Sequence, residues 1–255
     1  MSRDTRLVWV VGLVAMMAMD GSAVADGFLK QVTHTGAFEM MGQKVAAKDD
    51  TTTMWIGADR AASINGDTMT IVCIPAENSV LMINHQKKQY SKASLNMDEM
   101  IDKAMADKGE KDADQAAQAK EMMKAMMGQS KASVEPTAET KKIDNWQAKK
   151  YLVTLSMGMM NMNMQLWATE DIAIDYKLYQ ELSNRMLKQM PGTESLTKEM
   201  SKIKGVVVLS TTELKMMGQP VTAETRLLEF SDKPAPAGVY AIPAGYTEVP
   251  IGAGQ

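Results

Sequence analysis

The feature that most restricts the fold of this chain is an alternation of side chains within Met157–Trp167. The apolar residues Met162, Met164 and Leu166 are separated by Asn and Gln residues. A period of two residues is typical of a β-strand with one polar and one apolar face, because successive side chains of a strand point to opposite sides of the sheet. The segment therefore predicts a strand in a two-faced sheet.

The segment before it alternates in the same way, with Val153, Leu155 and Met157 separated by Thr154 and Ser156. If residues 158–161 form the turn, the two apolar rows become cross-strand neighbours on one side of a hairpin. We call this predicted surface the apolar wall, and its residues are Val153, Leu155, Met157, Met162, Met164 and Leu166.

Strand signals separated by turn residues continue through most of the chain. Asn65-Gly66-Asp67 is a strong hairpin turn, because Asn and Gly tolerate positive φ angles. Strands at this spacing with tight turns predict an antiparallel meander. The predicted strands are Phe28–Met41, Lys44–Ile56, Arg60–Ile64, Thr68–Ile74, Ser79–Asn84, Gln89–Ser94, Lys131–Ala138, Trp146–Met157, Met162–Thr169, Val206–Met217 and Val221–Phe230.

Segments rich in Ala, Met, Lys and Gln predict helices between these strands. Apolar residues at helical spacing form one stripe at Ala119, Met122, Met123 and Met126, and a second at Leu178, Leu182 and Met186. The predicted helices are Asp98–Met105, Asp114–Met127, Asp175–Met190 and Thr193–Lys204, the last ended by Gly205.

Together these elements predict an α+β fold, in which helices cover one face of a single antiparallel sheet. Residues 26–255 then form one domain. The proline- and glycine-rich tail Pro234–Pro250 carries Tyr240 and Tyr246, and we expect it to be extended and packed rather than helical.

Residues 1–25 have the organisation of a secretory signal peptide. Arg3 and Arg6 precede the uncharged run Leu7–Met19, and Ala23-Val24-Ala25 offers a cleavage site made of small residues. The uncharged run is too short to span a bilayer, and no later apolar segment is long enough to do so. We therefore expect an exported chain that begins at Asp26 and is periplasmic if the source is Gram-negative.

Composition and motifs argue against several classes of function. With 28 basic and 31 acidic residues, the net charge of −3 does not favour nucleic-acid binding. The chain has two histidines, His34 and His85, on different predicted strands, and it contains no phosphate-binding loop, nucleophile elbow or zinc-protease motif. We expect a protein that is not an enzyme and has no cofactor.

The chain has one cysteine, Cys73, so it cannot form an internal disulfide or a cysteine-based zinc site. The surrounding residues Thr68–Ile74 are mostly β-branched or apolar, which predicts a buried strand. We expect the thiol to be hidden, because no histidine or basic residue lies beside it in the sequence.

Methionine is the compositional anomaly, with 26 residues in a chain of 255. Three explanations of the apolar wall remain open. It is an ordinary core that uses methionine, or an adaptable surface that binds acyl chains, since unbranched thioethers reshape easily. The third is a copper(I) site at Met157, Met162 and Met164, because thioethers are soft ligands that suit this ion.

One short internal repeat links the two ends of the chain. Met40-Met41-Gly42-Gln43 recurs as Met216-Met217-Gly218-Gln219, in both cases between predicted strands. Duplication of a longer unit and convergence on one turn both explain such a match.

The order of elements resembles the LolA/LolB-like lipoprotein carrier superfamily, and more narrowly an exported bacterial family known as domain of unknown function 4412. The segments that carry the narrower resemblance are Met40–Gln43, Trp167–Thr169, Ile174–Tyr179, Lys198–Gly205 and Pro243–Tyr246. The resemblance implies an antiparallel half-barrel with helices covering its concave face. None of the carriers' lipid-handling residues has a motif match in this sequence.

Resemblance and composition together lead to one expectation about function. The concave face would hold a lipid or acyl chain against the apolar wall and the helix residues Leu178, Leu182 and Met186. Such a protein would be a carrier or sensor of lipids, with envelope lipoproteins as a second class of partner. A copper(I) protein and an interaction module without a small ligand are the alternatives.

Overall fold

The computed structural model describes residues 27–40, 43–57, 59–96, 99, 121, 131–157, 160–172, 198–216 and 219–250. The first half of the chain contains β1 (Gly27–Thr35), β2 (Phe38–Met40), β3 (Gln43–Val45), β4 (Lys48–Ile56), β5 (Ala61–Asn65), β6 (Met69–Ile74), the 3-10 turn η1 (Pro75–Glu77), β7 (Ser79–Asn84) and β8 (Gln89–Ser94). The second half contains β9 (Lys131–Ile143), β10 (Trp146–Met157), β11 (Met160–Thr169), β12 (Val206–Met216), β13 (Gln219–Asp232) and β14 (Thr247–Glu248).

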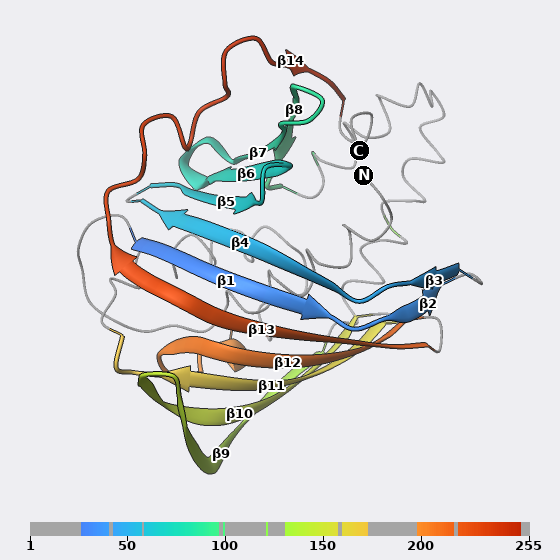
Figure 1. Cartoon of the computed structure of the whole chain (residues 1–255), viewed down its shortest axis with the longest axis vertical. Helices are drawn as coiled ribbons and strands as arrows, with labels where there is room; N and C mark the ends of the chain where they lie inside the picture. Colours follow the sequence, from blue (N-terminus) through green and yellow to red (C-terminus); the bar gives the residue numbers. More distant parts are fainter. Residues whose placement is uncertain are drawn as a thin grey trace.

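Twelve of these strands form one large sheet in the order β14-β8-β7-β6-β5-β4-β1-β13-β12-β11-β10-β9, and β2 and β3 form a separate pair. In the described part of the chain the sheet does not close into a barrel, since β14 and β9 are its two edges (Figure 1). This is a mostly-β protein.

The predicted meander is confirmed, and it occurs twice. Strands β4–β8 and β9–β13 each pair with their neighbours in sequence, and β1 lies between the two groups because it pairs with both β4 and β13. One pairing departs from the prediction: β14 runs parallel to β8, with Thr247 opposite Gln89. The sheet is therefore mixed rather than purely antiparallel.

The prediction of one strand over Phe28–Met41 is wrong, because the chain leaves the large sheet at Gly36. The Gly36 amide donates a hydrogen bond to the Thr222 carbonyl at 2.9 Å, and a Cβ at Gly36 would lie 2.7 Å from Thr222 Oγ1. A side chain at this position would require the Thr222 side chain to move. The next residues form the β2–β3 pair, which projects beyond the large sheet (Figure 1) and also divides the predicted strand Lys44–Ile56 into β3 and β4.

The register assigns every strand residue to one of two faces of the sheet. We call the face that carries Leu155, Met162, Thr225, Thr33 and Met54 the inner face, and the opposite face the outer face.

Buried apolar side chains on strands β9–β13 form one cluster with Met200 and Ile203. A second cluster joins residues from both meanders, including Met54, Cys73 and Leu227.

A third cluster lies on the outer face of β5–β8, where the C-terminal tail covers it. Val239, Tyr240 and Tyr246 pack against the buried side chains of Ala62, Val72, Ile74, Leu81 and Ile83. His85 links the tail to the sheet, with Nδ1 3.0 Å from the Tyr246 hydroxyl and Nε2 2.8 Å from Thr70 Oγ1. The prediction of an extended, packed tail is confirmed, and Figure 1 follows it in red from β13 to β14.

Most of the predicted helical residues lie outside the described residues, as do residues 1–25. Within the described ranges, helical backbone is limited to Glu99, Glu121, the turn η1 and residues 198–200. The predicted helix Thr193–Lys204 is too long at its C-terminal end, because the described helical backbone ends at Met200; Gly205, with φ +84°, instead lies directly before β12. No helix of the described chain has the length and hydropathy that crossing a membrane requires.

The internal repeat forms two hairpins with the same register. Met40 pairs with Gln43 between β2 and β3, and Met216 pairs with Gln219 between β12 and β13. Met157 and Met160 pair in the same way between β10 and β11. The same register thus occurs at a hairpin outside the repeat, so it does not require duplication of a longer unit.

Candidate functional site: the buried apolar wall

The two strands of the apolar wall share the predicted face, but their register differs by two residues from the one that a turn at residues 158–161 implies. Val153 lies opposite Met164 and Leu155 lies opposite Met162, all on the inner face. These four side chains and Leu166 are at most 4% exposed. These five side chains therefore form a buried surface in this structure.

The predicted turn at residues 158–161 is too long. Asn161 belongs to β11 and lies opposite Ser156, whose hydroxyl donates a 2.7 Å hydrogen bond to Asn161 Oδ1. Strand pairing continues to Met157 and Met160, which places Met157 in β10 as the last residue of the wall; its side chain lies outside the described residues.

Neighbouring strands extend the wall in both directions. Val134 of β9, Leu214 of β12 and Val221 of β13 belong to the same buried cluster. Tyr151, directly opposite Leu166, is 2% exposed, and its hydroxyl accepts a 3.1 Å hydrogen bond from the Lys204 amide. The polar end of this buried ring is thus satisfied, as burial of a phenol requires.

The short helical turn at residues 198–200 is fixed to the edge of the wall by Glu199. Its Oε2 accepts a 2.8 Å hydrogen bond from the Val134 amide, and Lys202 Nζ donates to both of its carboxylate oxygens at 2.6 Å. The Lys202 hydrogen bond, followed by that from Val134, lowers the pKa of Glu199. This contact holds Met200 and Ile203 against the buried cluster.

The other predicted ligand-binding residues, Leu178, Leu182 and Met186, lie outside the described residues. For the copper(I) alternative, the structure places Met162 and Met164 on one face of β11, opposite the aliphatic residues Leu155 and Val153. Among the described residues, no group of three or more His, Cys, Asp or Glu side chains is arranged to hold a metal ion.

A hollow of about 230 Å³ lies over strands β10–β12 with mostly outer-face side chains around it. It was not predicted from the sequence, because the polar residues of an alternating strand are expected to be solvated. The residues around it are Leu152, Val153, Thr154, Asn163, Met164, Gln165, Thr211 and Glu213.

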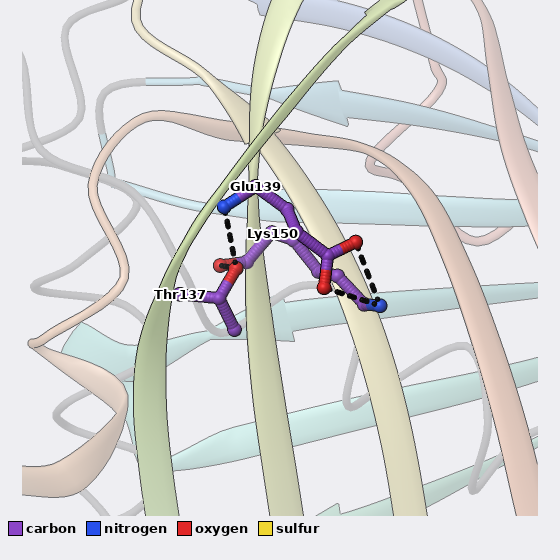
Figure 2. Close-up of polar contacts among 3 residues, drawn as sticks. All are labelled: Thr137, Glu139 and Lys150. Atoms are coloured by element: carbon purple, nitrogen blue, oxygen red, sulfur yellow. Dashed lines mark hydrogen bonds and ion pairs between the residues drawn. The ribbon is translucent and has the colours of Figure 1, made fainter.

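An irregularity in β9 shapes the edge of the sheet beside the wall. The register of β10 against β9 shifts between Lys149 and Tyr151 of β10. Figure 2 shows the side-chain contacts that replace regular pairing there. The Thr137 hydroxyl donates to the Lys150 carbonyl at 3.0 Å and accepts from the Glu139 amide at 3.1 Å, while Lys150 Nζ lies 3.1 Å from Glu139 Oε1. A bulged, charged edge strand resists pairing with a further strand.

The inner face is not apolar throughout, and sequence reasoning missed its polar part. Gln31 and Thr33 of β1, Asp50 of β4, Asn65 of β5 and Thr225 of β13 are all buried. Their inward position depends on strand register, which local residue patterns in short polar strands do not specify. In the structure every second residue of β1 from Leu29 to Thr35 is buried, but apolar and polar residue types do not alternate there, so the sequence contained no signal.

Cys73 is buried on the inner face, as expected, and is 8% exposed. Removal from water disfavours the charged thiolate, so burial raises the pKa of the Cys73 thiol to about 11. The folded protein therefore holds this sulfur as an unreactive thiol at neutral pH.

We expect the Cys73 thiol to react with iodoacetamide at pH 8 about a hundredfold more slowly in the folded protein than in urea, because the thiolate fraction falls with the raised pKa. Above pH 9 the unfolded chain loses this proton while the folded chain keeps it, so the free energy of unfolding should decrease from pH 9 to 11. Labelling followed by mass spectrometry measures the first effect. Urea unfolding of the wild type and Cys73→Ala measures the second, and an equal pH dependence of the two proteins would contradict it.

No protein-family model matches this sequence. A search of curated proteins finds no similar sequence either. The resemblance to the LolA/LolB-like carriers therefore stays a prediction.

Proposed function

We propose that this chain is a non-enzymatic binding protein that holds the acyl chain of a lipid or acylated molecule against the apolar wall. The observation that carries the proposal is the register of β10 and β11, which aligns Val153 with Met164 and Leu155 with Met162 on one buried face. Wall residues continue onto β9, β12 and β13, so the apolar surface extends across several strands.

The chemistry of the wall suits a guest that enters and leaves. Methionine is unbranched and has a polarizable sulfur, so Met162 and Met164 can adapt to acyl chains of different shape. Burial of each methylene contributes about 0.8 kcal/mol, and a long chain can therefore offset the loss of the contacts that cover the wall without ligand. Because the sheet satisfies its own backbone hydrogen bonds, the wall needs no water.

In this proposal the sheet is a half-barrel like that of the LolA/LolB-like carriers. The predicted helical stripes Ala119–Met126 and Leu178–Met186 cover its concave face when no ligand is bound, and an acyl chain takes their place. The protein is exported, periplasmic in a Gram-negative source, and acts as a carrier or sensor of lipids or lipoproteins. The predicted signal peptide supports export, and the two-faced sheet supports the half-barrel.

Titration of the delipidated protein with a fluorescent fatty-acyl probe tests the proposal, and we expect micromolar or tighter affinity. Met164→Ala removes apolar contact area from the wall and should weaken binding about tenfold. Asn163→Ala, the adjacent residue on the outer face, is the matched control and should leave the affinity unchanged.

Two results would contradict this function: failure of the wild-type protein to bind the probe, or equal losses in the two variants. Equal losses would place the probe in the outer-face hollow, where both residues contribute to the lining. Native mass spectrometry of protein purified from an exporting host adds an independent test, since we expect lipid to co-purify with it.

A further inference from the structure

One row of the inner face changes from apolar to polar as it crosses the sheet. The residues directly opposite one another on adjacent strands, from β10 to β4, are Tyr151, Leu166, Ser210, Thr225, Thr33 and Asp50. None of the six is more than 8% exposed. The row begins in the apolar wall, continues through three hydroxyl groups and ends at a carboxylate.

The two central hydroxyls form one buried hydrogen bond. Thr33 Oγ1 and Thr225 Oγ1 lie 2.9 Å apart, on strands that are 192 residues apart in sequence. A hydroxyl has one donor and two acceptor positions, so this pair can accept further hydrogen bonds. Gln31 and Asn65, both buried, add amide groups to the inner face beside the row.

One carboxylate oxygen of Asp50 accepts no hydrogen bond from the residues that the structure describes. Lys48 Nζ lies 2.7 Å from Asp50 Oδ1, whereas Oδ2 is buried and has no hydrogen-bond partner among the residues that the structure describes. Leaving a buried acceptor unpaired destabilises a fold, and such groups are rare in native proteins. The adjacent Asp49 differs, since it is exposed and lies 2.6 Å from His34 Nδ1.

From this row we infer that Asp50 Oδ2 and the Thr33–Thr225 pair receive the neutral, hydroxyl-bearing head group of the ligand whose acyl chain lies on the apolar wall. The inference rests on the proposed function and names its ligand class, an amphiphile with an uncharged hydrogen-bond donor at its head. Four strand spacings separate Leu166 from Asp50, about 19 Å, so an extended molecule can contact both ends of the row.

The charges of the site favour a neutral donor over an anion. Lys48 already balances the charge of Asp50, so a head group has to supply hydrogen bonds and not charge. A glycerol hydroxyl can donate to Oδ2 and accept from the one threonine hydroxyl whose proton is not used within the Thr33–Thr225 pair. A free fatty-acid carboxylate offers only acceptors, and its negative charge would lie beside that of Asp50.

Competition of three lauroyl ligands against the fluorescent probe tests this inference. Monolauroylglycerol carries hydroxyl donors, methyl laurate is neutral without donors, and laurate is an anion. We expect the wild-type protein to bind monolauroylglycerol about tenfold more tightly than the other two, as one hydrogen bond to a charged acceptor implies.

Asp50→Asn should abolish this preference. In this variant we expect the side-chain amide oxygen to remain bound to Lys48 Nζ. The amide nitrogen, which is a hydrogen-bond donor, then takes the place of the acceptor Oδ2. Asp49→Asn is the matched control, because it removes the same charge one residue away on the outer face, and it should keep the preference. Thr225→Val, which keeps the shape of threonine without its hydroxyl, should reduce the preference in a protein that retains Asp50.

The outcomes separate the two proposals. If the wild-type protein binds no lauroyl ligand, the proposed function fails. If it binds all three equally, or if Asp49→Asn and Asp50→Asn have the same effect, the assignment of the head group is overturned while acyl binding stands. Thermal unfolding monitors the fold of every variant. If Asp50 Oδ2 binds a ligand and does not stabilise the fold, Asp50→Asn should be no less stable than the wild type.

Discussion

Gly205→Ala should lower the free energy of unfolding by about 4 kcal/mol or more, the largest stability effect that we expect of a single methyl group in this chain. A Cβ at Gly205 would lie 2.0 Å from the Thr169 carbonyl oxygen and 2.8 Å from the Glu170 amide nitrogen, both backbone atoms. The residue also has φ +84°, which only glycine adopts without strain. Urea unfolding, followed by tryptophan fluorescence, measures the loss.

Gly238→Ala is the matched control for this prediction. Gly238 has the same φ of +84°, but no atom lies within 4 Å of its Cβ position. Its substitution introduces only the left-handed backbone strain, about 1 kcal/mol. Equal losses in the two variants would show that the close approach of Gly205 to the end of β11 does not contribute.

Leu166→Ala should lower the free energy of unfolding by about 3 kcal/mol, because Leu166 is fully buried and its truncation leaves a cavity between Tyr151 and Ser210. The neighbouring Gln165 is exposed on the outer face, so Gln165→Ala should change stability by less than about 0.5 kcal/mol. Urea unfolding of both variants measures the contrast. A small effect of Leu166→Ala would mean that the wall repacks easily, and would support the adaptability that the proposed function needs.

The wall is the part of the candidate site that local sequence predicts well. Strict alternation fixes which residues of β10 and β11 share a face. The register depends on the length of the connection, which the predicted turn at residues 158–161 made too long. The bounds of β7, β8 and β10 agree with the predicted strands, since turn residues bracket each of them.

The polar half of the inner face shows what local sequence cannot predict. In the sequence, Lys48, Asp49 and Asp50 are three successive charged residues within one predicted strand, and nothing distinguishes the two aspartates. In the structure, Asp49 pairs with His34 in solvent, whereas Asp50 is buried opposite Thr33. The difference arises from the register of β4 against β1, because successive residues of a strand point to opposite faces.

By itself, then, the sequence determined most of the strands and the composition of the apolar wall, because these depend on interactions between residues that are near one another in the chain. Tertiary structure alone decided that β1 joins the two meanders, that Thr33 meets Thr225, and that the tail covers β5–β8 and ends beside β8. These pairings join distant residues whose hydrogen bonds and buried area form only when the whole sheet assembles, so no local pattern encodes them.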